Sequence, residues 1–335
     1  MGQPPFDDAR GARPNAPATP PSRPDRARAW PPHTAPDALA PEVHAFLRAF
    51  ANDGPPGPRA LARLLDHYPT PTAAYAALQG GDLPSALADV AAAVRPALTA
   101  AAQADAARSF ARQAAAGDAV VALGERRYPP SLAAIHDPPP LMYVRGALPP
   151  TLAAPAGLAP AVAIVGTRRA SRGALAFARR LAYDVASTGT TVVSGLALGI
   201  DGAAHEGALA AAPDGTVAVL ATHLGAIHPP VHTDLAHRIA REGALLSDVP
   251  RPRRTQRRAF VRRNRIVSGL ARAVVVVEAP FRSGTRHTVD FAMEQGRDVF
   301  VVPHAATREA GRAAAAWLRE GARPLVDAAD LFDGG

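Results

Sequence analysis

The stretch that decides the fold is residues 161–205, AVAIVGTRRASRGALAFARRLAYDVASTGTTVVSGLALGIDGAAH. It opens with the apolar run Val162–Val165, passes through a glycine turn, and continues into an amphipathic segment at 172–187. The same order then repeats, because Thr191–Val193 is followed by a second helical segment. Strands that are apolar at every position are typical of a parallel sheet covered by helices on both faces. This stretch therefore predicts two consecutive strand–helix units.

The alternation continues to the end of the chain. The further strand-like runs are Val217–Leu220, Ala244–Leu246, Val274–Val277 and Val299–Val302. Helical segments are expected around 202–212, 231–242, 260–271, 286–295 and 308–320. Two shorter strand candidates, Val120–Leu123 and Leu141–Val144, lie in the connecting segment 117–150. The pattern predicts an α/β fold with a Rossmann-like, doubly wound, mostly parallel sheet over residues 117–335.

Two different segments precede this domain. Residues 1–41 hold eleven prolines, five arginines and almost no apolar periodicity, so we expect a disordered Pro/Arg-rich tail. Residues 42–116 show helical spacing, with Val43, Phe46 and Phe50 on one face, and predict a small all-helical, SAM-like domain. The chain stops at Gly335, so no C-terminal winged helix is expected.

Composition bounds the function. The 37 basic residues are all arginine and outnumber the 29 acidic ones, and a net charge of +8 favours a polyanionic partner. The chain has no cysteine, which excludes disulfides, thiol nucleophiles and Cys-ligated metals. No apolar run is long enough to cross a membrane and the N-terminus does not look like a signal peptide, so we expect a cytoplasmic protein. The histidines at 223, 228, 232 and 237 straddle Pro229-Pro230 without a metal-ligand spacing, so we expect no metal.

In a doubly wound fold, ligands bind at the carboxyl ends of the strands, which directs attention to the loops there. The first such loop runs from Gly166 through Arg168 and Arg169. It matches neither the dinucleotide fingerprint nor a P-loop. A glycine turn, arginines and a helix N-terminus form an anion site, while a tight turn with solvated arginines remains the alternative.

Two other loops carry polar groups. Ser194-Gly195 opens a loop that ends at Asp201, which we expect to cap the next helix, with His205 packed against its carboxylate. The serine does not lie in a hydrolase-type elbow. After the fifth strand, Ser283-Gly284-Thr285 offers backbone N–H groups and hydroxyls to an anion at a helix start.

The strongest signal is the stretch from Arg251 to Arg272, which carries nine arginines and no acidic residue. In its second half Phe260, Val261, Val267 and Leu270 are expected to face inward, so that arginines project near the strand ends. Arginine forks suit phosphate and an adjacent ring can stack on a base, although a solvated charged face is the alternative. On this interpretation, removing the exposed Arg262 and Arg263 side chains leaves the fold intact.

Taken together, these stretches resemble the DNA-processing protein A family (DprA, also called Smf). The matching pieces occur in order over about 125–332: Ile135-x-Asp137-Pro138-Pro139, Val165-Gly166-Thr167-Arg168, Val193 to His205, Ala218-Val219-Leu220, Pro229-Pro230, Gly243 to Ser247, Arg262 to Leu270, Val277-Glu278-Ala279, Ser283-Gly284-Thr285, Ala292 to Arg297 and Val302-Pro303. The helical domain resembles the family's N-terminal module more loosely.

The resemblance implies a single-stranded DNA-binding recombination mediator that protects incoming strands during natural transformation, helps to load the RecA recombinase and forms homodimers. It implies no cofactor and no catalysis. Carried over by position, the strand-binding residues are Gly166, Arg168, Arg169, Ser194, Gly195, Arg262, Arg263, Asn264, Ser283, Gly284 and Thr285. The sequence departs from the family pattern at His228, at Arg286-His287 and at Ala313–Ala316, which bears on the pocket more than on the fold.

Two rival hypotheses remain. The fold also resembles nucleotide phosphoribohydrolases of the lysine-decarboxylase-like group, which carry a Pro-Gly-Gly-x-Gly-Thr loop and a nearby catalytic Glu. Here the loop reads Phe281-Arg282-Ser283-Gly284-Thr285, and no carboxylate follows until Asp290. The other hypothesis is a basic scaffold that docks further proteins.

Overall fold

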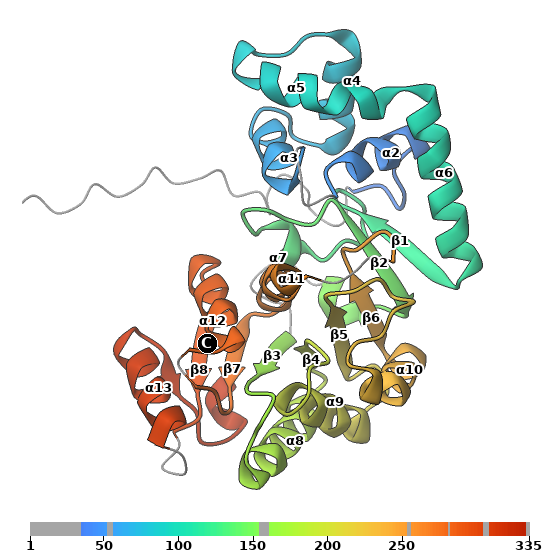
Figure 1. Ribbon diagram of the computed structural model, residues 1–335. Coiled ribbons are helices and arrows are strands. Elements are labelled where there is room, and N and C mark those ends of the chain that lie inside the picture. The colour runs from blue at the N-terminus through green and yellow to red at the C-terminus, as the bar shows by residue number, and fades with distance from the viewer. Residues whose placement is uncertain are drawn as a thin grey trace, which may run out of the picture.

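The computed structural model describes residues 35–51, 56–153, 161–252, 256–280, 282–303 and 308–332. The predicted tail up to residue 34, two arginines of the basic run (Arg253 and Arg254) and Phe281 lie outside the described residues. The described residues form one sheet with helices around it (Figure 1).

The sheet has nine strands in the order β1-β2-β6-β5-β4-β3-β7-β8-β9. The strands are β1 (Asp118–Ala122), β2 (Leu141–Gly146), β3 (Ala161–Val165), β4 (Thr191–Ser194), β5 (Thr216–Leu220), β6 (Ala244–Ser247), β7 (Ala273–Val276), β8 (Asp298–Val301) and β9 (Arg323–Pro324). All neighbours from β6 to β9 pair in parallel, whereas β1 and β2 add an antiparallel edge next to β6. The predicted mostly parallel α/β fold is confirmed.

The helices of the described residues are α2 (Pro41–Ala49), α3 (Pro58–Leu65), α4 (Pro71–Gly80), α5 (Ala88–Val94), α6 (Ala100–Ala115), α7 (Pro130–Ala133), α8 (Arg172–Ser187), α9 (Ile200–Ala211), α10 (Thr233–Glu242), α11 (Arg257–Leu270), α12 (Gly284–Glu294) and α13 (Arg308–Arg319). Those that follow β3 in the chain, α8–α13, cover both faces of the sheet. Successive side chains of β3 point to opposite faces of the sheet, and their neighbours show which helices cover each face. Val162 and Ile164 pack with residues of α8 and α9, whereas Ala163 and Val165 belong to the core that α11 and α12 share.

The N-terminal helices α2–α6 sit at the β1–β2 edge of the sheet (Figure 1). Val43, Phe46 and Phe50 are buried, as their helical spacing predicts, and they belong to the same apolar cluster as Met142 and Tyr143 of β2. Residues 35–40 also contact this region, because the Leu39 N–H donates to Glu125. The helical module and the sheet therefore share a continuous core, and the boundary at residue 116 stays a prediction.

The strand order reverses at β3. From β3 the chain moves through β4, β5 and β6 on one side, and α11 then returns it to β7 on the other side of β3. The connection after β3 leads to α8 on one face, and the connection after β7 leads to α12 on the opposite face. Diverging connections of this kind open a crevice at the carboxyl ends of the two strands, which is where α/β sheets bind ligands.

No helix in the described part of the chain is long and apolar enough to cross a membrane.

Candidate functional site

A cleft of about 960 Å³ occupies this crevice. Among the described residues that line it are six arginines, one phenylalanine and one carboxylate: Arg168, Arg169, Arg257, Arg263, Arg282, Arg286, Phe260 and Asp201. The walls come from the loops after β3, β4 and β7, from α11 between Arg257 and Val267, and from the start of α12. The cleft is therefore strongly positive, which suits an anionic ligand.

Nine of the eleven predicted site residues line this cleft: Gly166, Arg168, Arg169, Gly195, Arg263, Asn264, Ser283, Gly284 and Thr285. Ser194 and Arg262 do not line it. Ser194 is fully buried, and its hydroxyl donates to the Ile164 carbonyl at 2.6 Å, so it joins β4 to β3. The structure thus brings nine of the predicted residues together in one cleft and leaves the side chains of Ser194 and Arg262 outside it, and the part of each in DNA binding stays a prediction.

The loop after β3 brings the exposed arginines into the cleft. Gly166 has no room for a side chain, because an added Cβ would lie 2.7 Å from the Glu278 carbonyl and against Ile200. The Thr167 N–H donates to that carbonyl at 2.6 Å, which fixes the start of the loop. Arg168 then extends over the Phe260 ring at 5.6 Å from its centroid. A guanidinium stacked on a ring presents both a charge and a flat surface to a ligand.

Glu278 organises this loop and was missed as a site residue by sequence reasoning. It lies two residues past β7, is buried, and its carboxylate accepts hydrogen bonds from the Ser171 backbone N–H at 3.1 Å and the Ser171 hydroxyl at 2.7 Å. The same hydroxyl caps α8 by accepting from the Ala174 N–H. Glu278 therefore fixes the start of α8 against β7. An acidic residue directly after an apolar, strand-like run was the feature of the sequence that could have indicated this role.

Arg263 lies at the bottom of the cleft and is buried, contrary to the expectation that it is exposed. Its guanidinium donates to the carbonyl oxygens of Gly195 and Val219, and its Nε donates to Asn264 at 3.2 Å. An added Cβ on Gly195 would collide with this guanidinium, which explains the glycine there. Burial lowers the pKa of Arg263 to about 10, so the side chain remains charged at neutral pH. The expectation that Arg263 is exposed is therefore wrong, and we now expect its removal to lower stability.

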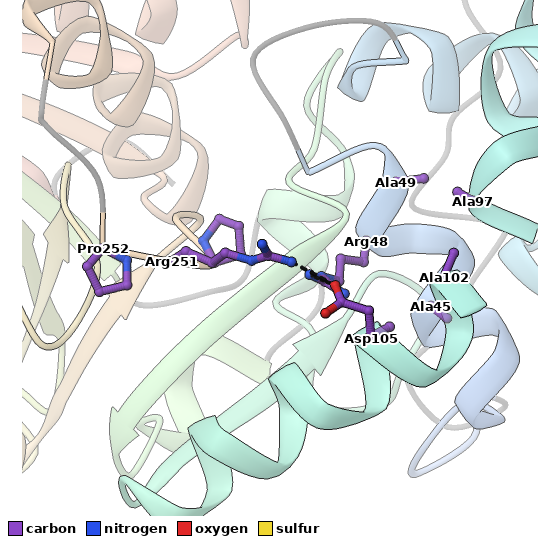
Figure 2. A pocket seen from close by; sticks show the side chains of 10 residues that line it. Ala45, Arg48, Ala49, Ala97, Ala102, Asp105, Arg251 and Pro252 are labelled. Atoms are coloured by element: carbon purple, nitrogen blue, oxygen red, sulfur yellow. Dashed lines mark hydrogen bonds and ion pairs between the residues drawn. The ribbon is translucent and has the colours of Figure 1, made fainter. Parts of the chain in front are cut away.

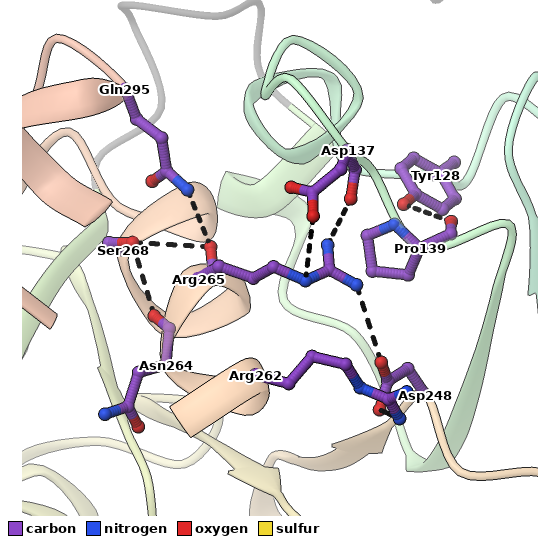
Figure 3. Close-up of polar contacts among 9 residues, drawn as sticks. All are labelled: Tyr128, Asp137, Pro139, Asp248, Arg262, Asn264, Arg265, Ser268 and Gln295. Atoms are coloured by element: carbon purple, nitrogen blue, oxygen red, sulfur yellow. Dashed lines mark hydrogen bonds and ion pairs between the residues drawn. The ribbon is translucent and has the colours of Figure 1, made fainter. Parts of the chain in front are cut away.

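The half-buried Arg262 and the buried Arg265 meet at the Asp248 carboxylate (Figure 3). Arg262 donates to Asp248 at 3.3 Å, and burial together with Arg265 lowers its pKa to about 10. Arg265 is almost fully buried, donates to the Asp137 carbonyl and lies 3.6 Å from the Asp248 carboxylate. These two arginines hold α11 against the segments before β2 and after β6. The expectation that Arg262 is exposed is wrong, because its side chain is half-buried, pairs with Asp248 and does not line the cleft.

Asp201 stabilises the loop after β4. Helix α9 begins at Ile200 after Gly199, so Asp201 is already in the first turn and is not the predicted cap. Its carboxylate instead accepts from the backbone N–H groups of Gly195 and Ala197, at 3.1 and 3.2 Å. Burial raises the pKa of this carboxyl, against the opposing effects of Arg263 and the two N–H donors.

His205 is fully buried but does not contact Asp201, which corrects the expected pairing. Its Nδ1 lies 2.7 Å from the Thr216 hydroxyl, which itself donates to the Val192 carbonyl. The hydroxyl therefore accepts from Nδ1–H, which sets the neutral tautomer. Burial lowers the pKa of His205 to about 3 from its ordinary value of 6.5.

The lowered pKa of His205 predicts that the folded protein loses stability in acid. The unfolded chain takes up a proton on His205 below pH 6.5 and the folded chain does not until about pH 3, so stability falls as the pH drops through that window. Between pH 7 and pH 5 the loss amounts to about 2 kcal/mol. Urea unfolding at both pH values should show this loss in the unsubstituted protein, and less of it in His205→Gln. His67→Gln, at an exposed histidine, is the control. An unchanged pH dependence in His205→Gln would contradict a neutral buried imidazole.

The start of α12 forms the wall opposite the loop after β3. Ser283 precedes the helix without capping it through its side chain, and its buried hydroxyl has no hydrogen-bond partner among the described residues. Gly284 has open space where a side chain would be, and its carbonyl accepts from the Asn264 amide at 3.2 Å. The first N–H groups of a helix carry a partial positive charge and suit a phosphate oxygen.

The residues that depart from the family pattern can each be located in the structure. The His228 ring packs edge-on against Phe260, with centroids 5.5 Å apart. Arg286 lines the cleft and pairs with Asp290 at 2.7 Å and with Glu320 at 3.3 Å. Ala313 and Ala314 are buried in α13. Within the described residues, no three His, Asp or Glu side chains gather as a metal site requires.

Comparison with known proteins identifies the family. Residues 119–334 match the model of DNA recombination-mediator protein A. The chain belongs to this family. The DNA processing protein DprA of Bacillus subtilis is 32% identical over 213 residues, which cover 64% of this chain and 70% of that protein. Protein Smf of Synechocystis is 42% identical over 177 residues, 53% of this chain but 44% of that protein. The match thus spans less than half of the Synechocystis protein.

Two solved structures of the family are similar to this chain. The DNA processing protein A of Streptococcus pneumoniae superposes with a TM-score of 0.69 at 24% identity, covering 88% of this chain and 98% of that one, and supports the fold. The Helicobacter pylori protein, whose structure was described for its single-stranded DNA binding mode, superposes with a TM-score of 0.56 at 27% identity, covering 64% of this chain and 94% of that one.

Proposed function

We propose that this chain binds single-stranded DNA in the cleft at the carboxyl ends of β3 and β7. The observation that carries the proposal is the set of six arginines around a crevice that also offers a helix N-terminus and an aromatic ring. Arginine forks bind phosphate oxygens, and a ring beside them accepts the face of an unpaired base. The description of the H. pylori relative as a single-stranded DNA binder supports the same ligand.

The residues have separate parts in this proposal. Arg168 and Arg169 are exposed and contact the phosphates, while the Phe260 ring beneath Arg168 stacks on a base. The start of α12 at Gly284 and Thr285 holds a further phosphate through its N–H groups. Arg263 supports the floor of the cleft and adds positive charge from below.

Family membership suggests a wider role, which we also propose. In this proposal the chain is a cytoplasmic recombination mediator that protects incoming single strands during natural transformation, helps to load RecA and acts as a homodimer. The family match supports the recombination role in general terms.

Titration with single-stranded and duplex DNA tests the ligand. The cleft is walled by loops and is not shaped to fit a DNA duplex. We therefore expect single strands to bind more tightly than duplex DNA at physiological salt. The logarithm of the affinity should fall linearly with the logarithm of the salt concentration, with a slope of about −0.7 per phosphate neutralised. Equal affinity for duplex DNA would overturn the cleft as the binding site.

We propose that the cleft binds its ligand without catalysis. The carboxylates near it are engaged in other contacts: Asp201 accepts two backbone N–H groups, Glu278 accepts from Ser171, and Asp290 pairs with Arg286. A phosphoribohydrolase needs a carboxylate that is poised for proton transfer.

We therefore expect no release of base from nucleoside monophosphates by the purified protein. The measurement is chromatography of the nucleotide after long incubation, with Asp290→Asn as the matched variant. Turnover that disappears in Asp290→Asn would favour the enzyme hypothesis instead.

A further inference from the structure

A second basic site lies between the helical module and the sheet. A notch of about 440 Å³ is formed by α2, α6 and the segment after β6, and is lined by Ala45, Arg48, Ala49, Ala97, Ala102, Asp105, Ala106, Pro250, Arg251 and Pro252. Figure 2 shows Arg251 reaching from the sheet side toward Asp105 on α6, with Arg48 of α2 beside it. Three separate segments therefore meet at one carboxylate.

The Asp105 carboxylate is surrounded by more positive charge than it neutralises. Arg48 and Arg251 both donate to the same oxygen, Oδ2, at 2.9 and 2.8 Å, and Arg108 lies 3.8 Å from the other oxygen. Three arginines against one carboxylate leave an excess of positive charge. Asp105 and Arg251 are also substantially exposed, at 43% and 56% of their side chains, so an anion from solvent can reach them. A carboxylate held by arginine forks occupies the position that a phosphate group also fits.

The notch is close to the cleft along the chain. Arg251 precedes Arg257, which lines the cleft, by six residues. A fully extended chain of this length spans at most about 22 Å. At a rise of about 3.4 Å per nucleotide, this distance corresponds to no more than about six stacked nucleotides. The alanine wall of the notch offers an apolar surface for a base or a deoxyribose.

We propose that this notch is a second phosphate subsite, which takes the DNA strand as it leaves the cleft. Arg251 and Arg48 bind the phosphate, and Asp105 occupies both arginines in the free protein and competes with the strand for them. The subsite rests on the proposed function of the cleft. It makes the helical module part of the binding surface and lets binding strength depend on strand length.

The test compares oligothymidylates of about 4 and about 16 nucleotides, the two ends of the range that single binding units cover. The shorter strand is chosen because about six nucleotides already span the distance from the cleft to the notch. Arg251→Ala should weaken binding of the long strand about fivefold and make its salt slope shallower by about 0.7, with the short strand unchanged. Asp105→Asn should strengthen binding of the long strand about fivefold, because it removes the competing charge. The junction does not depend on Asp105 alone, since Gln113 on α6 also donates to the Pro250 carbonyl at 3.0 Å.

Asp89→Asn is the matched control, because Asp89 also pairs with an arginine of the helical module, Arg63, but lies outside the notch. It should change neither length. Weaker binding of the long strand by Asp105→Asn would mean that the ion pair only anchors the module, and it would overturn the subsite. Equal effects of Arg251→Ala on both lengths would also overturn it. Failure of the cleft itself gives a different result, namely that Arg168→Ala alters neither strand.

Discussion

Arg263→Ala is expected to lower the free energy of unfolding by about 3 kcal/mol, because it leaves buried polar groups without partners. The Gly195 and Val219 carbonyls lose their guanidinium donor, and the buried Asp201 carboxylate loses its nearest source of positive charge. Denaturant unfolding measures the change through the transition midpoint. DNA affinity should fall as well, since the loop at Gly195 loses its support.

The control for this variant is Arg180→Ala. Arg180 is an exposed arginine of α8 whose partner is Asp184 on the same helix, and its loss should change stability by no more than about 0.5 kcal/mol. If Arg263→Ala were as stable as Arg180→Ala, Arg263 would have no structural role and the description of the cleft floor would be wrong.

The double variant Arg168→Ala/Arg169→Ala is expected to lose more than a hundredfold in affinity for single strands while keeping its fold. Each charge-assisted contact to phosphate contributes about 1.5–3 kcal/mol, so two contacts account for a loss of that size. Both side chains are exposed, and truncating them opens no cavity. The measurement is an oligothymidylate titration at fixed salt, together with a melting curve.

Arg180→Ala serves again as the matched control, because it removes one exposed arginine from α8 without touching the cleft. Comparable losses of affinity from this variant would show that diffuse charge, and not a site, explains binding. A large fall in melting temperature for the double variant would contradict the exposure of Arg168 and Arg169.

Local pattern was enough to predict most of the fold. Each predicted strand from Val162–Val165 to Val299–Val302 occurs within one residue at either end, and the helix expected at 172–187 has those bounds. A short run that is apolar at every position is buried on both faces, which identifies it as a strand of a sheet covered by helices. The antiparallel β1–β2 pair was not predicted as the edge of the sheet. This pair joins the sheet where β2 pairs with β6, which lies about a hundred residues later in the chain, and pairing between such distant strands leaves no local signal in the sequence.

The candidate site was predicted less completely. The loops after parallel strands must meet at one edge, so Gly166, Gly195 and Gly284 could be placed from topology alone. Which arginines of α11 face inward depends on the rotation of the helix. A signal for Arg263 was present, since it lies three, four and seven residues before Ile266, Val267 and Leu270, which are all buried. Phe260 and Val261 had been assigned to that apolar face, but both line the cleft.

The central claim, that a single strand lies in the cleft between the loops after β3 and β7, is tested most directly by photocrosslinking. An oligothymidylate with iodouracil in place of thymine would be irradiated on the protein and the modified peptide mapped by mass spectrometry. The account predicts that the adduct forms on the start of α11, at Phe260, and that it disappears in Arg168→Ala/Arg169→Ala. Adducts that form only on segments away from the cleft, and that persist in the double variant, would contradict it.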